Sequence, residues 1–245
     1  MSIRRTLLVM SIAALTVSAF APAALAADHA ERNGPPLRTY EVTIDNLTGG
    51  QWFTPALAAT HRRSTDVFDV GAPASVGVQQ IAENGNLAPL HAALAADRHV
   101  SDVVVAASPS GPPPIAPGAT LTFEITAEPG AQVLSWVSML ICTNDGFTGL
   151  DSLRLPRAVG DSVHVDTHGY DAGTEVNTED FADLVPPCAQ LTGFGDQGGT
   201  GSSDPALAED GVIRHHPGID GDADLVPAIH GWSGPVASVE VTRIG

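Results

Sequence analysis

The chain has 245 residues, and its 28 acidic residues outnumber its 11 basic ones, so its formal net charge at pH 7 is −17. Such an acidic chain is not suited to binding nucleic acid or an anionic membrane by charge alone, because the phosphates of either would repel it. The sequence also lacks the Gly-x-Ser-x-Gly, HExxH and phosphate-loop motifs of common enzyme classes, so we expect a protein without catalytic activity.

The first 26 residues have the pattern of a signal peptide. Arg4 and Arg5 precede an apolar stretch at residues 7–20, and Ala24-Leu-Ala26 forms an A-x-A cleavage site. We therefore expect secretion after cleavage behind about Ala26, which would remove two arginines and change the net charge from −17 to −19. No later apolar run reaches the roughly 18 residues that a membrane-spanning helix needs.

The remainder of the chain is long enough for one domain with its own core. Residues 27–39 are polar and contain Pro35-Pro36, so they are predicted to be a flexible lead-in. No linker-like break divides the β-rich region that follows. We therefore predict a single domain at residues 40–245.

The first half of this domain contains one predicted strand, one predicted loop and one predicted helix. Apolar and polar residues alternate from Tyr40 to Ile44, which is typical of a half-buried strand. Residues 51–64 combine two aromatic residues, a proline and an alanine-rich stretch, which we interpret as a loop over the core. Residues 87–96 have leucines at helical spacing and follow a possible cap at residues 84–86, so they predict one short helix.

The second half of the domain reads as strands separated by turns. Residues 109–118 contain too many prolines to continue a ladder. Residues 132–142 are almost continuously apolar and predict a central strand. Four further segments predict strands: 100–107, 121–125, 162–165 and 236–243. Many short strands with Gly/Pro-rich turns indicate an all-β fold, an antiparallel β-sandwich with one short helix and long loops.

Two segments are dense in oxygen-bearing side chains: CTNDGFTGLD at residues 142–151 and YDAGTEVNTE at residues 170–179. Ca²⁺ takes six to eight oxygen ligands at about 2.3–2.6 Å, mostly carboxylates and carbonyls. Two such loops at one end of a sandwich would supply them. The alternative is that these acids and amides build turns by hydrogen-bonding their own backbone. Zinc is disfavoured, because the cluster holds oxygen donors only and the i, i+4 pair His164 and His168 suits zinc only on a helix.

The same residues carry a family resemblance. CTNDGFTG at residues 142–149 and DAGTE at residues 171–175 resemble two signature segments of the spondin N-terminal domain. HHPGIDGDADL at residues 215–225, with Trp232 and the closing strand at 235–243, resembles the end of that domain. The resemblance covers residues 40–243 and is nearest to secreted bacterial single-domain members. It implies a C2-like β-sandwich that binds one structural Ca²⁺.

The resemblance also implies the ligands of that ion, namely Asp145, Asp171 and Glu175. Glu175 departs from the family pattern, in which Asp is also common at this position. Further oxygens could come from neighbouring side chains, namely Asn144, Asp151, Asn177 and Glu179. The Asp-rich turn at residues 220–224 resembles half of a calcium loop but lacks the sixth-position Gly and twelfth-position Glu of an EF-hand.

The two cysteines of an exported protein are expected to pair. A Cys142–Cys188 bridge would enclose both oxygen-rich segments, whereas the alternative is two buried thiols.

Together these features predict a secreted calcium-binding adhesion or recognition module, whose partner is an extracellular protein or polymer that the sequence does not identify. A calcium-dependent hydrolase or lyase acting on an extracellular polymer is the alternative. A C2-like lipid binder is less well supported, because the chain has no basic patch.

Overall fold

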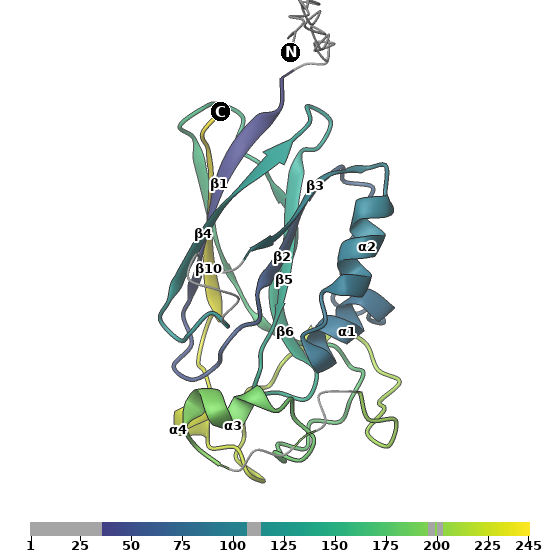
Figure 1. Ribbon diagram of the computed structural model, residues 1–245, viewed down its shortest axis with the longest axis vertical. Helices are drawn as coiled ribbons and strands as arrows, with labels where there is room; N and C mark the ends of the chain where they lie inside the picture. The colour runs from purple at the N-terminus through teal and green to yellow at the C-terminus, as the bar shows by residue number, and fades with distance from the viewer. Residues whose placement is uncertain (1–35, 107–113, 196–198, 200–202) are drawn as a thin grey trace, which may run out of the picture. The chain divides into compact units, whose positions relative to one another are not determined.

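The computed structural model describes residues 36–106, 114–195, 199 and 203–245. These residues form two antiparallel sheets with four short helices (Figure 1). The predicted signal peptide, residues 27–35 of the predicted lead-in and residues 109–113 of the proline-rich stretch lie outside the described residues. The prediction of an all-β antiparallel sandwich is confirmed.

The smaller sheet has four strands in the order β4-β1-β10-β7. The strands are β1 (Arg38–Asn46), β4 (Thr120–Ala127), β7 (Ser162–Thr167) and β10 (Ala237–Arg243). The alternation of β1 places Tyr40, Val42 and Ile44 on a fully buried face. Val42 pairs with Val241 of β10 on one side and with Phe123 of β4 on the other.

The larger sheet has six strands in the order β3-β2-β5-β6-β8-β9. The strands are β2 (Ala56–His61), β3 (Val100–Ala106), β5 (Val133–Met139), β6 (Gly146–Arg154), β8 (Gly169–Asp171) and β9 (Arg214–His215). The central strand predicted at residues 132–142 is β5, which lies between β2 and β6 and ends at Met139, before the turn at residues 141–145.

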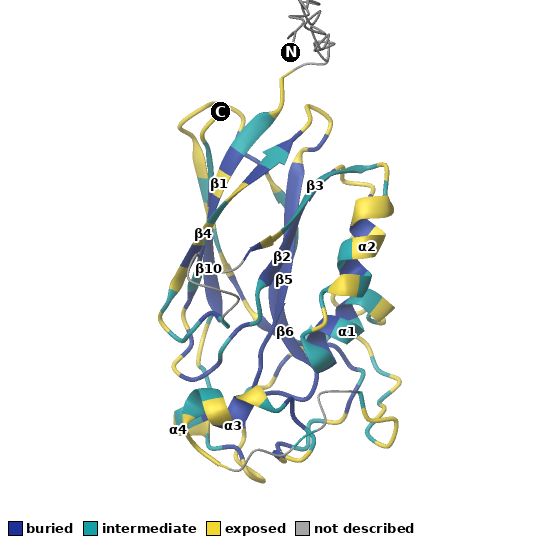
Figure 2. Ribbon diagram, viewed as in Figure 1, coloured by how far each residue is buried: buried dark blue, intermediate teal, exposed yellow. Residues whose placement is uncertain are grey.

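Both faces of the larger sheet are covered. On one face Ala58 and Trp136 belong to the core shared with the smaller sheet. On the other face Leu57 and Val137 belong to a second core with helices α1 (Val76–Asn84) and α2 (Ala88–Ala96). Every residue of β2 and β5 is buried, as the dark blue ribbons in Figure 2 show. Two-sided burial explains why β5 is mostly apolar, with only two serines, instead of alternating.

This second core accounts for two elements that the sequence did not predict. Residues 51–64 are not only a loop, because they contain β2, whose ALAATH sequence has small residues and no alternation. Helix α1 was also missed: Ser75 accepts a hydrogen bond from the backbone N–H of Val78, and Gly85 ends the helix with a φ of 64°. The predicted helix at 87–96 corresponds to α2. Two short helices, α3 (Pro187–Thr192) and α4 (Pro227–His230), lie at the loop-rich end (Figure 1).

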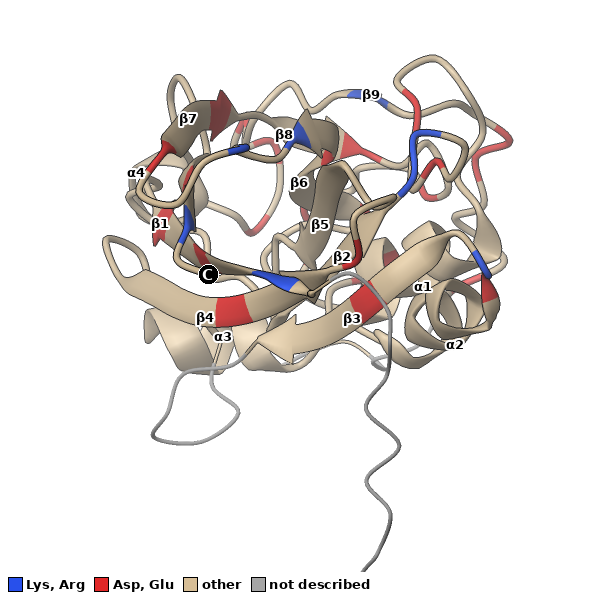
Figure 3. Cartoon of the chain, turned by 90° about the horizontal axis from the view of Figure 1, so that it is seen from above, with Lys and Arg blue, Asp and Glu red and all other residues tan. Residues whose placement is uncertain are grey.

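Charged residues are spread over the described fold. Figure 3 shows acidic positions on strands of both sheets and on the connecting loops, with a few arginines between them. None of the helices in the described part of the chain is long and apolar enough to cross a membrane.

The predicted disulfide is confirmed. Cys142 follows β5, Cys188 lies in α3, and their sulfur atoms are joined across a sequence separation of 46 residues. The bridge ties the turn that follows β5 to the segment beyond the second oxygen-rich loop.

We expect the double substitution Cys142→Ser/Cys188→Ser to lower the free energy of unfolding by about 4 kcal/mol, because the bridge restricts the unfolded chain. Urea denaturation of the variant and the oxidised protein, followed by circular dichroism, measures this difference. Equal denaturation midpoints for the two proteins would contradict a stabilising role.

Candidate metal centre

The structure brings the two oxygen-rich segments together. The first is a tight turn at residues 141–145 between β5 and β6, and the second follows β8. Strands β6 and β8 pair so that Gly146 lies opposite Asp171. The backbone N–H of Ala172 donates to the carbonyl of Asp145 at 3.1 Å. The turn is shorter than expected, because residues 146–154 form β6.

Asp145 is the centre of this junction and is fully buried. Its Oδ2 accepts hydrogen bonds from the N–H of Thr174 (2.7 Å), the hydroxyl of Thr174 (3.1 Å) and the N–H of Glu175 (3.0 Å). Its Oδ1 is buried and has no hydrogen-bond partner. Burial, followed by the nearby charge of Asp171, raises the pKa of Asp145 to about 6.

Asp171 is also fully buried, but both of its carboxylate oxygens have partners. Oδ1 accepts from the N–H of Gly173 at 2.7 Å, and Oδ2 accepts from Asn177 Nδ2 at 2.6 Å and from Arg214 Nη2 at 3.0 Å. Arg214, on β9, also forms an ion pair with Glu209 at 3.0 Å. The charge of Asp171 is therefore compensated by a cation that the chain itself supplies.

The D-A-G-T-E loop needs its glycine. Gly173 has a φ of 68°, a left-handed conformation that side chains rarely adopt. A Cβ there would lie 2.6 Å from the backbone nitrogen of Val212. The carbonyl of Gly173 accepts from the N–H of Gly211 at 2.9 Å. The segment at residues 203–211, which leads to β9, therefore covers this loop, and we call it the covering segment.

Glu175 is buried beneath the same covering segment, with only 4% of its surface exposed. Its Oε1 accepts from the N–H of Asp204 at 2.8 Å. Burial is the main reason that its pKa is raised to about 7, and the charges of Glu83, Asp145 and Asp204 add to the effect.

The three predicted ligands are neighbours but are not gathered around one point. Among the described residues, the single group of three or more Asp, Glu, His or Cys side chains with ligand atoms within 4.8 Å of one another is Cys142, Cys188 and His230. Since its two cysteines are bridged, that group does not suit a metal. Asp145 and Glu175 fit a hard cation, because they are buried carboxylates and Asp145 has an oxygen without a donor. Asp171 fits less directly, because Arg214 already pairs with it.

The other candidate oxygens have different roles. Asn144 exchanges hydrogen bonds with Thr178, at 3.1 Å for each bond, and so joins the two loops. Asp151 lies in β6 and accepts from the N–H of Val67 and the hydroxyl of Ser135. It therefore anchors the sheet and does not contribute to the centre.

The Asp-rich turn at residues 220–224 has the opposite polarity to a calcium loop. The carboxylate of Glu179 accepts from the backbone N–H groups of Asp220, Gly221 and Asp222 at 2.7, 2.7 and 3.2 Å. Successive N–H groups that point at one carboxylate form an anion-binding nest. The turn is therefore held by an internal anion.

The histidine pair lies on a strand and in the turn beyond it. His164 belongs to β7 and contacts the hydroxyl of Ser238 at 2.6 Å, and His168 lies between β7 and β8. The helix that a zinc pair at this spacing requires is not present in this segment.

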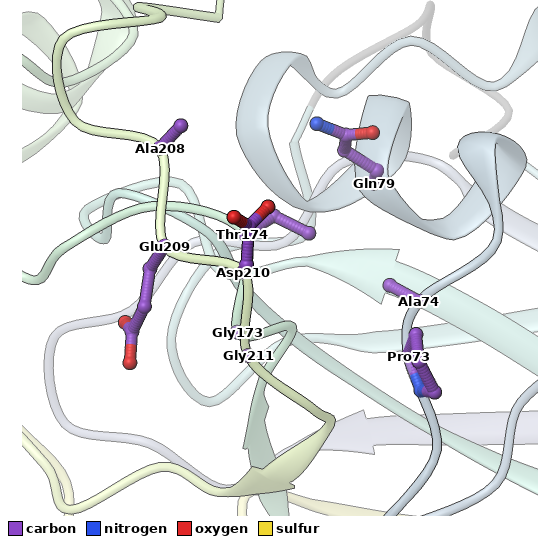
Figure 4. A pocket seen from close by; sticks show the side chains of 9 residues that line it. All are labelled: Pro73, Ala74, Gln79, Gly173, Thr174, Ala208, Glu209, Asp210 and Gly211. Carbon is purple, nitrogen blue, oxygen red and sulfur yellow. The ribbon is translucent and has the colours of Figure 1, made fainter.

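A hollow of about 360 Å³ lies beside the centre (Figure 4). Thr174, which donates twice to Asp145, is part of its wall. Neither Asp145 nor Glu175 lines it. The wall is formed by Pro73, Ala74, Gln79, Gly173, Thr174, Ala208, Glu209, Asp210 and Gly211.

Comparison with known proteins identifies one family. The family model described as Spondin_N matches residues 45–181, more than half of the chain. The match includes both oxygen-rich segments and ends before Cys188 and Arg214. No curated protein matches the chain.

Neither Arg214 nor the covering segment could be assigned to the centre from the sequence. Arg214 is 43 residues from Asp171 along the chain, and a lone arginine carries no motif. The sole sequence signal near it was the turn at residues 215–225, which the resemblance places at the end of the domain.

The raised pKa values predict how the stability of the metal-free protein depends on pH. The unfolded chain releases the protons of Asp145 and Glu175 near their ordinary pKa values of 3.8 and 4.5, whereas the folded protein keeps them until about 6 and 7. The folded state therefore binds more protons in this window, and the free energy of unfolding should fall as the pH rises through it.

Denaturant unfolding at pH 4.5–8 in the presence of a chelator measures this slope. The variant Glu175→Gln should have a shallower slope, because it has lost one of the two groups. A metal-free stability that rises between pH 5 and 7, equally in both proteins, would refute the assignment.

Proposed function

Because the chain belongs to the spondin N-terminal domain family, we propose that it is an extracellular recognition module whose loop-rich end is ordered by one Ca²⁺ held by Asp145, Asp171 and Glu175. Members of the family are extracellular and generally non-enzymatic. The signal-peptide pattern at residues 1–26 supports the same location, with secretion after cleavage behind about Ala26.

The observation that carries the proposal is the unpartnered Oδ1 of Asp145. A buried carboxylate is costly unless each oxygen is hydrogen-bonded or its charge is compensated. Here one oxygen receives three hydrogen bonds and the other receives none. A divalent cation would supply the missing compensation and would reduce the repulsion between Asp145, Asp171 and Glu175.

Arg214 gives the loops a second source of order. Its ion pair with buried Asp171 holds the D-A-G-T-E loop against β9 through contacts that do not involve a metal. The metal-free protein should therefore keep its fold, and Ca²⁺ should add stability to an existing structure. A loop held both by the Arg214 ion pair and by Ca²⁺ suits a module whose surface must be rigid for a partner.

Recognition is better supported than catalysis. A hydrolase or lyase would need an acid and a base facing a cleft. The two acids with raised pKa values are buried and do not line the hollow, and Asp145 is bonded to Thr174, which does. The partner we propose is an extracellular protein or polymer that sits on the loop-rich end.

We expect Ca²⁺ to raise the thermal stability of the chelator-stripped protein, and Mg²⁺ to do so much less. At a hundredfold excess over Kd the stabilisation should be about 2.7 kcal/mol. The substitution Asp145→Asn should abolish most of this response, because it removes the charge of the central ligand. Asp161→Asn, at an exposed position before β7, is the matched control and should respond like the original protein. A calcium response that survives in Asp145→Asn would overturn the ligand assignment.

The role of Arg214 leads to a further expectation. Arg214→Gln leaves the buried charge of Asp171 without its ion pair, so the metal-free protein should lose roughly 1–3 kcal/mol of stability. Ca²⁺ should recover part of that loss, so the variant should gain more from the ion than the original protein does. Thermal unfolding with and without Ca²⁺ measures both effects, with exposed Arg63→Gln as control. Equal calcium gains in Arg214→Gln and the original protein would contradict the compensation argument.

A further inference from the structure

Three arginines line a second hollow, at the end of the fold away from the candidate metal centre. This hollow has a volume of about 210 Å³. Its wall is formed by Arg38, Gln132, Arg154, Leu155 and Arg157, and we call it the arginine pocket. Among the described residues, no Asp or Glu belongs to this wall. Such a grouping of positive charge is unexpected in a chain with 28 acidic and 11 basic residues.

The topology places the arginine pocket opposite the candidate metal centre. Strand β6 begins at Gly146, which lies beside Asp171, and ends at Arg154. Arg38 is the first residue of β1, and this end of β1 pairs with the last residues of β4 and β10. Figure 3 looks onto this end of the described fold and shows basic positions near the C-terminus. The two sites therefore lie at opposite ends of β6.

The arginines of the pocket are not paired with acids of the chain. In the described part of the chain, Arg214 forms ion pairs with carboxylates, whereas none is present at the three arginines of the pocket. Arg154 and Arg157 are exposed, and their guanidinium groups donate no hydrogen bond to any described residue. Like charges around one hollow repel one another, so an anion there would be attracted by all three.

Backbone contacts hold Arg38 in place. Its Nη2 donates to the carbonyl oxygens of Glu128 and Ala131 at 2.6 and 2.5 Å, in the turn between β4 and β5. Its Nε is buried and has no hydrogen-bond partner, so the positive charge of this group is only partly compensated. Because the side chain is already held, a bound anion would not have to order it.

The segment that follows β6 and carries Arg157 is also held by the fold. The N–H of Leu155 donates to the carbonyl of Gln132 at 2.9 Å. The hydroxyl of buried Tyr40, on β1, donates to the carbonyl of Pro156 at 3.2 Å. The backbone around the pocket is therefore fixed, while two of its guanidinium groups remain available to a ligand.

We propose that the arginine pocket binds a phosphate group, either as the free ion or as a monoester on an extracellular polymer. The planar fork of a guanidinium group matches the oxygens of phosphate, and hydrogen bonds between charged groups are about twice as strong as neutral ones. Three positive charges favour a phosphate monoester, with a charge of about −1.5 to −2 at pH 7, over a singly charged carboxylate. The pocket shares no residue with the metal centre, so this inference goes beyond the proposed function and does not rest on it.

The acidic character of the chain limits what the pocket can bind. A formal net charge of −17 repels a long polyanion. At physiological salt, however, exposed charges are largely screened beyond about 8 Å, so an anion in the pocket interacts mainly with the three arginines. We therefore expect the pocket to take a single phosphate group, with an affinity that falls as the salt concentration rises.

Calorimetric titration of the mature chain with inorganic phosphate at low salt tests the proposal. The protein is first stripped of metal, and the chelator is then removed because it is itself an anion. Arg154→Gln/Arg157→Gln should raise Kd for phosphate at least about tenfold, because it removes two charged donors. Arg154→Lys/Arg157→Lys keeps the charge but loses the fork, so it should raise Kd by a smaller factor. Arg63→Gln/Arg98→Gln removes the same charge at exposed positions outside the pocket and should leave Kd nearly unchanged.

Phosphorylated and unphosphorylated samples of one polysaccharide distinguish the two sources of the phosphate group. Tighter binding of the phosphorylated polysaccharide than of inorganic phosphate assigns the pocket to a polymer, and weaker binding assigns it to the free ion. The unphosphorylated sample should not bind. Glucuronate, a sugar with a carboxylate, should bind more weakly than phosphate.

Several results would overturn the inference. These are no phosphate binding by the original protein, an unchanged Kd in Arg154→Gln/Arg157→Gln, an equal loss in the control variant, and glucuronate binding as tight as that of phosphate. Circular dichroism checks that each variant is folded. If the double variant does not fold, Arg157→Gln decides, and an unchanged Kd in that variant overturns the inference. Phosphate affinity is measured without Ca²⁺, so its failure is distinct from a failure of the calcium response.

Discussion

The buried carboxylate of Asp145 joins the segments on which the loop-rich end depends. It lies in the turn between two strands of the larger sheet and accepts three hydrogen bonds from the loop that follows β8. The turn also carries Cys142, whose disulfide reaches α3. One side chain and one covalent bond from the same five-residue turn therefore fix two separate segments of the chain relative to the sheet. The geometry of the end is set by polar contacts, whereas the sheets below it are set by apolar packing.

The sequence predicted a strand best where burial leaves a clear apolar pattern, as an alternation in β1 or an apolar run in β5. Strand β1 alternates because one face is buried and the other faces solvent, and a period of two is easily recognised. Strand β2 has both faces covered, by the core shared with the smaller sheet on one side and by the core with α1 and α2 on the other, so its ALAATH sequence shows no period. Helix α1 is only nine residues long and buries three apolar residues, Val78, Ile81 and Ala82, so its helical period is weak.

The sequence could indicate the two oxygen-rich segments of the candidate site, but not the residues from other parts of the chain that surround them. The residues 142–149 and 171–175 are close in sequence to turn signals, and pairing of β6 with β8 makes them neighbours, so a motif could identify them. Arg214, the segment at residues 203–211 and the end of α1 reach the same place through tertiary packing. Those contacts depend on where β9 and α1 lie, and no local pattern encodes that. Sequence reasoning therefore found the acids and missed what surrounds them.

The buried acids at this end differ in how their charge is compensated, and the difference points to the place of a cation. Glu179 is held by three backbone N–H groups, and Asp171 is held by Arg214, Asn177 and a backbone N–H. For these two groups the chain supplies the donors itself. Asp145 and Glu83 each have donors on one oxygen and none on the other. If the fold merely needed acids to build turns, complete hydrogen bonding would be expected for all four. At Asp145 the missing donor instead leaves a buried charge that an external cation would compensate.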